Sequence, residues 1–208
     1  MTALIETHYL PSIAYFAAIH DADGIILERN ENYTKQTYRN RCHIVTSQGK
    51  ETLILPLTSK HGKVLITDVR IDYSQKWLNN HWRAIQSAYG KAPFFEYYKE
   101  DLEKVLFRNT QFLYDLNIEL LSMCLKWLKW GMTIKETEVY HKSPVLHVLD
   151  LRSAINPKNE ENLQHFYRTS IYYQVFGNTF VKNASIIDLI FCEGPEAARI
   201  VQLSAIEK

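Results

Sequence analysis

Cysteine is scarce in this sequence, and its spacing argues against the common cysteine-based architectures. Only Cys42, Cys124 and Cys192 occur among the 208 residues, and no two of them form a CxxC pair. An odd count at wide spacing argues against a disulfide framework and against a zinc ribbon. We therefore expect three buried thiols in a protein of the reducing cytoplasm.

Glycine-rich nucleotide loops and common catalytic motifs are also absent. The seven glycines form neither GxGxxG nor a Walker A loop, and the chain contains no GxSxG and no HExxH. Support is therefore lost for dinucleotide binding of the usual kind, for P-loop chemistry, for α/β-hydrolase chemistry and for zincin chemistry. The sequence leaves any cofactor unknown.

One tripeptide, Asp21-Ala22-Asp23, matches the DxD pattern with which many nucleotide-sugar glycosyltransferases hold a divalent cation. Such a pair usually follows a strand, whereas this one precedes the apolar run 24–28 and closes a predicted helix. A solvated helix end is the simpler interpretation of so short a pattern. No metal site is predicted.

Neither an excess of one charge nor a long apolar run is present. The formal net charge is +1, so no overall field favours nucleic acid or an anionic membrane. Residues 112–130 are the most apolar stretch, but four charged side chains exclude a membrane span. The start of the chain lacks the features of a signal peptide. The expected partner is a small ligand, without nucleic acid or membrane insertion, and an oligomer is left open.

The first third of the chain predicts mainly strands. Residues 3–6 and 24–28 are expected to form strands on either side of a helix over residues 12–20, an order that favours a parallel pair. Residues 38–46, 52–57 and 65–71 are then expected to form three consecutive antiparallel strands, because polar and apolar residues alternate there.

Helices are predicted for the middle and the end of the chain. Apolar spacing and Gly90 predict a helix over residues 77–89, followed by helices over 93–107 and 111–130. Further elements are a late strand at residues 133–138, a long unpatterned segment at 152–169, and helices at 184–192 and 195–203. The expected fold is α/β, with mixed α+β as the alternative. One domain spans residues 1–208, and its central mixed sheet has an antiparallel portion and helices on its flanks; its strand-rich part is about residues 1–72 and its helical part about 77–130.

A local excess of positive charge lies between residues 29 and 43. If residues 38–46 form a strand, Arg39, Arg41 and His43 share one face, with successive Cβ atoms roughly 7 Å apart. A guanidinium group in such a row can hold a phosphate or carboxylate through two hydrogen bonds. The alternative is a solvated face whose charges pair with acidic residues of neighbouring strands.

His81 is the second candidate for chemistry. It lies one helical turn after Trp77 and one turn before Ile85, on an apolar face of the predicted helix. A histidine at such a position can carry a proton. The alternative is a core or boundary histidine whose hydrogen bonds are satisfied.

Several stretches together resemble the WbqC-like family of bacteria. In the first half they are Tyr9-Leu10-Pro11 with Tyr15-Phe16, Lys35 followed by Tyr38-Arg39-Asn40-Arg41, Leu55-Pro56-Leu57, Trp77 with His81, and Tyr89 with Ala92-Pro93-Phe94-Phe95. In the second half they are Asp150-Leu151-Arg152 with Pro157-Lys158, Tyr172-Tyr173-Gln174-Val175-Phe176, and Asn183 through Phe191 with Gly194-Pro195. Where many members carry Gln-Pro or His-Gln-Pro, this chain carries Glu6-Thr7-His8.

The resemblance implies a connection with surface polysaccharides, because members are often encoded among genes for O-antigen assembly. It suggests a transferase that acts on a phosphorylated or nucleotide-linked sugar. The alternative is a non-catalytic protein that binds such a ligand or serves as a scaffold. The residues alone leave open whether the protein is an enzyme.

The resemblance strengthens a set of predicted site residues. Substrate binding is assigned to Lys35, Arg39, Asn40, Arg41, Tyr173 and Gln174, and catalysis to His81. In the expected mechanism the cationic side chains hold the anion and His81 acts as general base on an acceptor. The segment 152–169 is expected to close over the ligand as a lid.

Overall fold

The strands form two separate sheets in the computed structural model, which describes residues 1–58, 62–143, 147–177 and 179–206. The larger sheet contains β1 (Thr2–Ile5), β2 (Gly24–Leu27), β5 (Thr133–Glu136) and β6 (Val148–Asp150), in the order β5-β2-β1-β6. Every neighbouring pair in it is parallel. The predicted parallel pair around the first helix is therefore confirmed, and all strands end at the same edge of the sheet.

The smaller sheet is an antiparallel hairpin of β3 (Arg41–Thr46) and β4 (Gly49–Ile54), in which Arg41 lies opposite Ile54. The prediction of a third antiparallel strand at residues 65–71 is wrong. That stretch contains a 3₁₀ helix, Ile66–Asp68, and its β-pairing with the other described residues consists of isolated bridges. Ile66, Val69 and Ile71 are the buried residues there, so the burial does not follow the alternation of a strand.

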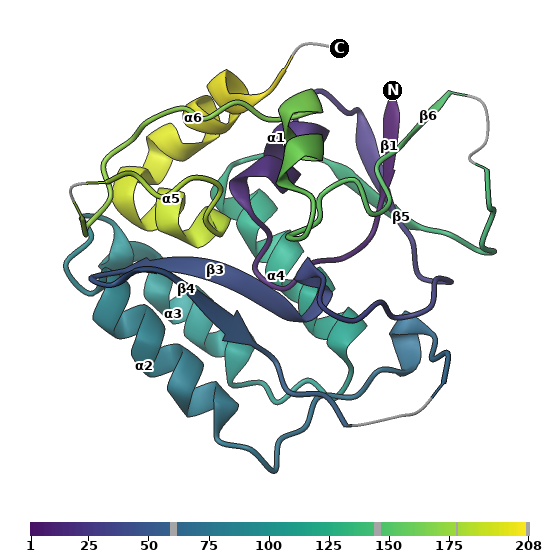
Figure 1. Ribbon diagram of the computed structural model, residues 1–208, viewed down its shortest axis with the longest axis horizontal. Coiled ribbons are helices and arrows are strands. Elements are labelled where there is room, and N and C mark those ends of the chain that lie inside the picture. Colours follow the sequence, from purple (N-terminus) through teal and green to yellow (C-terminus); the bar gives the residue numbers. More distant parts are fainter. Residues whose placement is uncertain (59–61, 144–146, 178, 207–208) are drawn as a thin grey trace.

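The helices pack between and around the two sheets (Figure 1). They are α1 (Ile13–Ile19), α2 (Trp77–Tyr89), α3 (Phe95–Leu106), α4 (Leu113–Trp127), α5 (Ile186–Glu193) and α6 (Ala197–Ser204). Short 3₁₀ helices occur at Tyr38–Asn40, Glu160–His165 and Gly194–Glu196. The α/β class, the helical middle of the chain and the helices near its end are confirmed.

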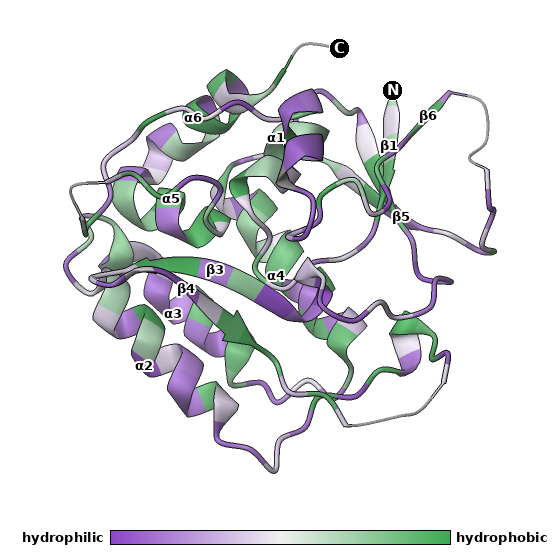
Figure 2. Ribbon diagram, in the orientation of Figure 1, coloured by the Kyte–Doolittle hydropathy of each residue, from purple (hydrophilic) through white to green (hydrophobic). Residues whose placement is uncertain are grey.

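The core lies where α1, α4 and α5 meet the parallel sheet and the hairpin. Every residue of α1 is buried. Figure 2 shows α5 as predominantly hydrophobic, whereas hydrophilic residues are spaced along α2. This agrees with a helix inside the core and an amphipathic helix that covers β3. The three cysteines are buried and free, as predicted.

No helix in the described part of the chain is both long enough and apolar enough to cross a membrane.

Candidate functional site

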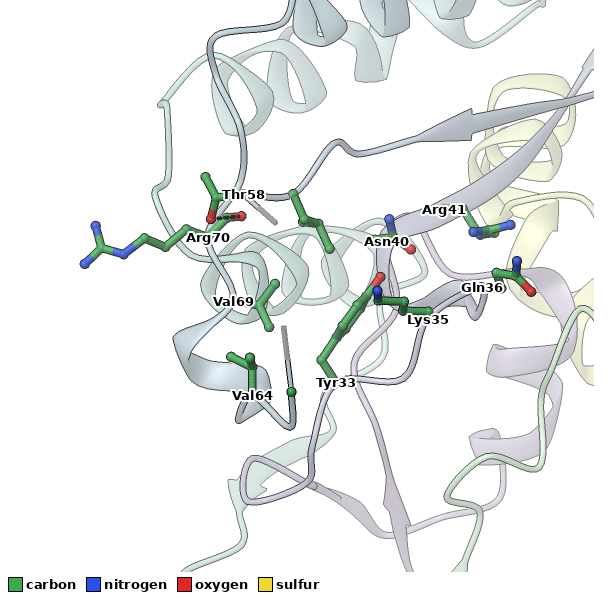
Figure 3. A pocket seen from close by; sticks show the side chains of 11 residues that line it. Tyr33, Lys35, Gln36, Asn40, Arg41, Thr58, Val64, Val69 and Arg70 are labelled. Carbon is green, nitrogen blue, oxygen red and sulfur yellow. Dashed lines mark hydrogen bonds between the residues drawn. The ribbon is translucent and has the colours of Figure 1, made fainter. Parts of the chain in front are cut away.

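A pocket of about 350 Å³ brings together three of the predicted site residues, Lys35, Asn40 and Arg41. We call it the Arg41 pocket. It forms where the chain around residues 33–41 faces the chain around residues 57–70 (Figure 3). The described residues that line it are Tyr33, Lys35, Gln36, Asn40, Arg41, Leu57, Thr58, Gly62, Val64, Val69 and Arg70.

Backbone hydrogen bonds fix the two sides of the Arg41 pocket to each other. The Tyr33 amide donates to the Val64 carbonyl over 2.8 Å. Asn40 is held twice, because its carbonyl accepts from the Leu55 amide at 2.8 Å and its Nδ2 donates to the Leu55 carbonyl at 2.9 Å. These hydrogen bonds therefore hold the backbone on both sides of the pocket in place.

The Arg41 pocket has an excess of positive charge. Its described lining includes Lys35, Arg41 and Arg70, but no aspartate or glutamate. Figure 3 shows the guanidinium of Arg70 directed away from the other polar side chains. Among the described lining residues, Lys35 and Arg41 are thus the cationic groups available to a bound ligand.

Two buried polar atoms at this pocket lack a partner among the described residues. They are Oδ1 of Asn40, an acceptor, and Nε of Arg41, a donor. A buried polar atom without a hydrogen bond costs about 1–3 kcal/mol, so a ligand that supplied the missing bonds to these two atoms would be favoured. One is an acceptor and the other a charged donor, and both belong to residues that line the pocket.

Arg39 does not share the exposed face of Arg41 and His43, so the predicted row of three basic side chains is wrong. The strand begins only at Arg41, and Arg39 lies in the preceding 3₁₀ helix with 1% of its surface exposed. Its Nε and Nη2 donate to the two carboxylate oxygens of Glu31 over 2.7 and 2.6 Å. The turn at residues 38–40 points this side chain inward, where it lies 3.5 Å from Glu6.

Glu6 follows β1 directly and is fully buried at the edge where the parallel strands end. Its carboxylate accepts from the Ser153 amide at 2.8 Å, lies 3.2 Å from Nε2 of His8 and faces Arg39. Burial raises the pKa of Glu6, but the His8 hydrogen bond and the Arg39 charge outweigh it and hold this pKa at about 2. Ligands often bind at this edge of a parallel sheet; here the protein's own carboxylate occupies it.

The Glu6→Gln variant tests this assignment through the pH dependence of stability. Because the folded pKa lies below the ordinary value of 4.5, the ionised carboxylate stabilises the fold above about pH 4.5, and this contribution is lost as the pH falls toward 2. The shift corresponds to about 3 kcal/mol. Urea unfolding should show wild type more stable than the variant near neutral pH, with a gap that narrows on acidification.

Glu31 has the opposite effect on the pH slope, since burial raises its pKa despite the Arg39 hydrogen bond. Both proteins retain Glu31, so their difference reports on Glu6. A matched control is Glu136→Gln, which removes an exposed carboxylate paired with Arg29. A gap between wild type and Glu6→Gln that stays constant from about pH 6 to pH 3 contradicts the assignment.

His81 lines a different pocket, of about 380 Å³, which we call the His81 pocket. The described residues that line it are Ile54, Pro56, Gln75, Lys76, Trp77, Asn80 and His81. Nδ1 of His81 lies 3.0 Å from the hydroxyl of Tyr9, and burial raises the pKa of that tyrosine, which keeps its proton. Burial lowers the pKa of His81 to about 4, although a hydrogen bond with the Ile54 backbone opposes the change. The imidazole is therefore neutral near neutral pH.

Tyr173 and Gln174 lie apart from both pockets as the described residues line them. Tyr173 is 59% exposed. Gln174 donates to Asp188 at 2.9 Å and exchanges hydrogen bonds with the backbone of Val181, which fixes the preceding segment on α5. No described residue of the segment 152–169 lines either pocket, and the predicted lid is not in contact with them.

Comparison with known proteins identifies the family of this chain. A model of the WbqC-like protein family matches residues 7–159, which is more than half of the chain. The chain belongs to the WbqC-like protein family. Every residue that lines the Arg41 pocket or the His81 pocket lies inside this range, whereas Tyr173 and Gln174 lie beyond it.

One relative of this WbqC-like protein is the uncharacterized protein Rv1507c of Mycobacterium tuberculosis (strain ATCC 25618 / H37Rv). It is 35% identical over 96 residues, which cover 45% of this chain and 40% of the relative. The match thus spans less than half the length of that relative. No solved structure matches the chain.

The sequence did not identify the far wall of the Arg41 pocket. Val64 and Val69 come from the stretch that was predicted as a strand, and Tyr33 carried no signal beyond its place two residues before Lys35. The buried cluster of Glu6, Arg39 and Glu31 was also missed. Its one signal was Glu31, the only acidic residue within the basic stretch 29–43. The described residues contain no group of three or more His, Cys, Asp or Glu side chains that could hold a metal ion.

Proposed function

We propose that this WbqC-like protein binds a phosphorylated or nucleotide-linked sugar in the Arg41 pocket, as a transferase of surface polysaccharide synthesis. The observation that carries the binding step is the pairing of Lys35 and Arg41 in a pocket whose described lining has no carboxylate. The transferase assignment rests on the family, not on the pocket.

The chemistry of the pocket suits an anionic group that carries a neighbouring hydroxyl. Arg41 can donate to two oxygens of a phosphate, and the Lys35 ammonium adds a point charge. Oδ1 of Asn40 has no partner among the described residues and can accept a hydrogen bond from a ligand hydroxyl. Arg39 supports the site indirectly, because its pairing with Glu31 holds the turn that precedes Arg41.

His81 keeps its proposed role as general base. Its neutral imidazole meets the first requirement of a base, and the Tyr9 hydroxyl orients the ring through Nδ1. Tyr173 and Gln174 are not among the described residues that line either pocket, so no ligand contact is proposed for them; Gln174 instead bonds to Asp188 of α5.

The second candidate function is ligand binding without catalysis, and one observation favours it. A pKa of about 4 makes His81 a weak base, and both the Tyr9 hydroxyl and the Ile54 backbone already engage its ring. A general base works best when its pKa lies near the working pH. Tight ligand binding without turnover would support this reading.

A thermal-shift screen tests the binding step. The panel contains inorganic phosphate, sugar phosphates, nucleotide sugars and coenzyme A, each beside an uncharged counterpart such as the free sugar. A ligand at about 100 times its dissociation constant stabilises the folded state by about 2.7 kcal/mol. In a protein of this size the melting temperature then rises by roughly 5–10 °C. A panel in which no anionic ligand raises it, or in which free sugars act equally, contradicts the proposal.

A further inference from the structure

The His81 pocket lies at the start of α2, and its polar groups are nearly all uncharged. Two amide side chains, Gln75 and Asn80, line it beside the neutral imidazole, and Lys76 is its one charged residue among those described. Amide side chains both donate and accept hydrogen bonds, as hydroxyl groups do. This set matches a hydroxyl-bearing group better than a second anion.

Two residues that line this pocket, Gln75 and Trp77, have side-chain atoms without a hydrogen-bond partner among the described residues. Gln75 uses its Nε2 to donate to Asp72 at 3.0 Å, which leaves its Oε1 as an acceptor. The buried Nε1 of Trp77 has no hydrogen-bond partner among the described residues. A buried indole N–H usually finds a partner, so a ligand that accepts a hydrogen bond from this donor would be favoured.

The His81 pocket and the Arg41 pocket are neighbours on the hairpin. Arg41 lines one and Ile54 lines the other, and these two residues lie directly opposite each other on β3 and β4. Opposite residues of an antiparallel pair place their side chains on the same face, with Cβ atoms about 4.5–5.5 Å apart.

We propose that the His81 pocket is a second subsite, which holds the uncharged sugar ring of a ligand whose phosphate binds at Arg41. The Arg41–Ile54 pair, which joins the linings of the two pockets, is the reason for placing one sugar phosphate across both. This inference rests on the proposed function, because it takes the Arg41 pocket as the anion site. It assigns Asn80 and Gln75 to recognition of sugar hydroxyls.

The Asn80→Ala variant tests the subsite, with two ligands titrated by calorimetry. The ligands are inorganic phosphate and a sugar 1-phosphate, either glucose 1-phosphate or N-acetylglucosamine 1-phosphate. Asn80 is exposed, so its replacement leaves the fold intact. Loss of one neutral hydrogen bond should weaken sugar phosphate binding about 2- to 10-fold and leave phosphate binding unchanged. The matched control is Asn79→Ala, an exposed neighbour on α2 outside the described lining of the pocket.

The outcomes separate the subsite from the anion site. If wild type binds the sugar phosphate no more tightly than phosphate, or if Asn80→Ala behaves like Asn79→Ala with both ligands, the subsite is wrong and the anion site stands. If phosphate does not bind, or binds equally to wild type and Arg41→Ala, the proposed function is wrong and the inference built on it falls too.

Discussion

Replacing Arg39 by methionine is expected to lower the free energy of unfolding by about 3–5 kcal/mol, because it leaves two acidic side chains without their cation. Glu6 is 1% exposed, and the Glu31 side chain is only slightly more accessible at 11%. A buried carboxylate that loses its partner must either stay charged at a high desolvation cost or take up a proton. The measurement is urea unfolding at neutral pH.

The control for this prediction is Arg29→Met, which removes an arginine of the same stretch from a largely exposed pair with Glu136. Exposed pairs contribute about 0–1 kcal/mol, so this variant should stay close to wild type. Arg39→Lys should fall between the two, because it keeps the charge but cannot reproduce the paired hydrogen bonds to Glu31. Equal losses for Arg39→Met and Arg29→Met would contradict the inward placement of Arg39.

Replacing Arg41 by alanine is expected to weaken the binding of a sugar phosphate by roughly 10- to 150-fold, since hydrogen bonds to charged groups contribute about 1.5–3 kcal/mol. The loss should appear with every phosphorylated ligand, because it removes the group that holds the phosphate. Unfolding stability should change little, since Arg41 is only partly buried. Isothermal titration calorimetry measures the affinity directly.

The matched control is Arg70→Ala, which removes the same charge from the same neighbourhood. The Arg70 guanidinium is directed away from Lys35 and Asn40 in Figure 3 and lies 4.9 Å from the centre of the Phe112 ring. Its removal should reduce affinity only through the weaker long-range field, and this small loss should disappear at high salt. Similar losses of affinity in the two variants would mean that binding depends on the overall positive charge of this region and not on a specific contact with Arg41.

The elements that the sequence predicted well are those whose pattern is local. The helix Trp77–Tyr89 was predicted with its observed bounds, because its apolar spacing is regular and Gly90 follows it. The parallel pair of β1 and β2 was predicted from the order of strand, helix and strand. The strand β6, Val148–Asp150, was missed because three residues are too few to show a period.

The errors concern features that depend on distant parts of the chain. The alternation at residues 65–71 is compatible with a strand, but the burial there is set by packing on α4 and by bridges to distant residues. The local sequence does not distinguish Arg39 from Arg41. Only the turn at residues 38–40 and the carboxylates of Glu6 and Glu31 distinguish the two arginines, and no local pattern reports on them.

The site was predicted in part, for the same reason. Lys35, Asn40 and Arg41 are close in sequence and line one pocket, whereas the walls that make it a pocket come from residues 57–70. His81 was identified, but its separate pocket and its bond to Tyr9 join residues that are far apart in the chain. Gln174 was placed at the ligand because it borders a long loop, and its partners are instead Asp188 and Val181.

The claim that the Arg41 pocket binds the anionic group of a sugar phosphate is tested most directly by calorimetric titration of wild type beside Arg41→Ala. The account predicts one saturable site in wild type and an affinity roughly 10- to 150-fold lower in the variant. Equal affinities in the two proteins, or no binding to wild type at millimolar ligand, would contradict it.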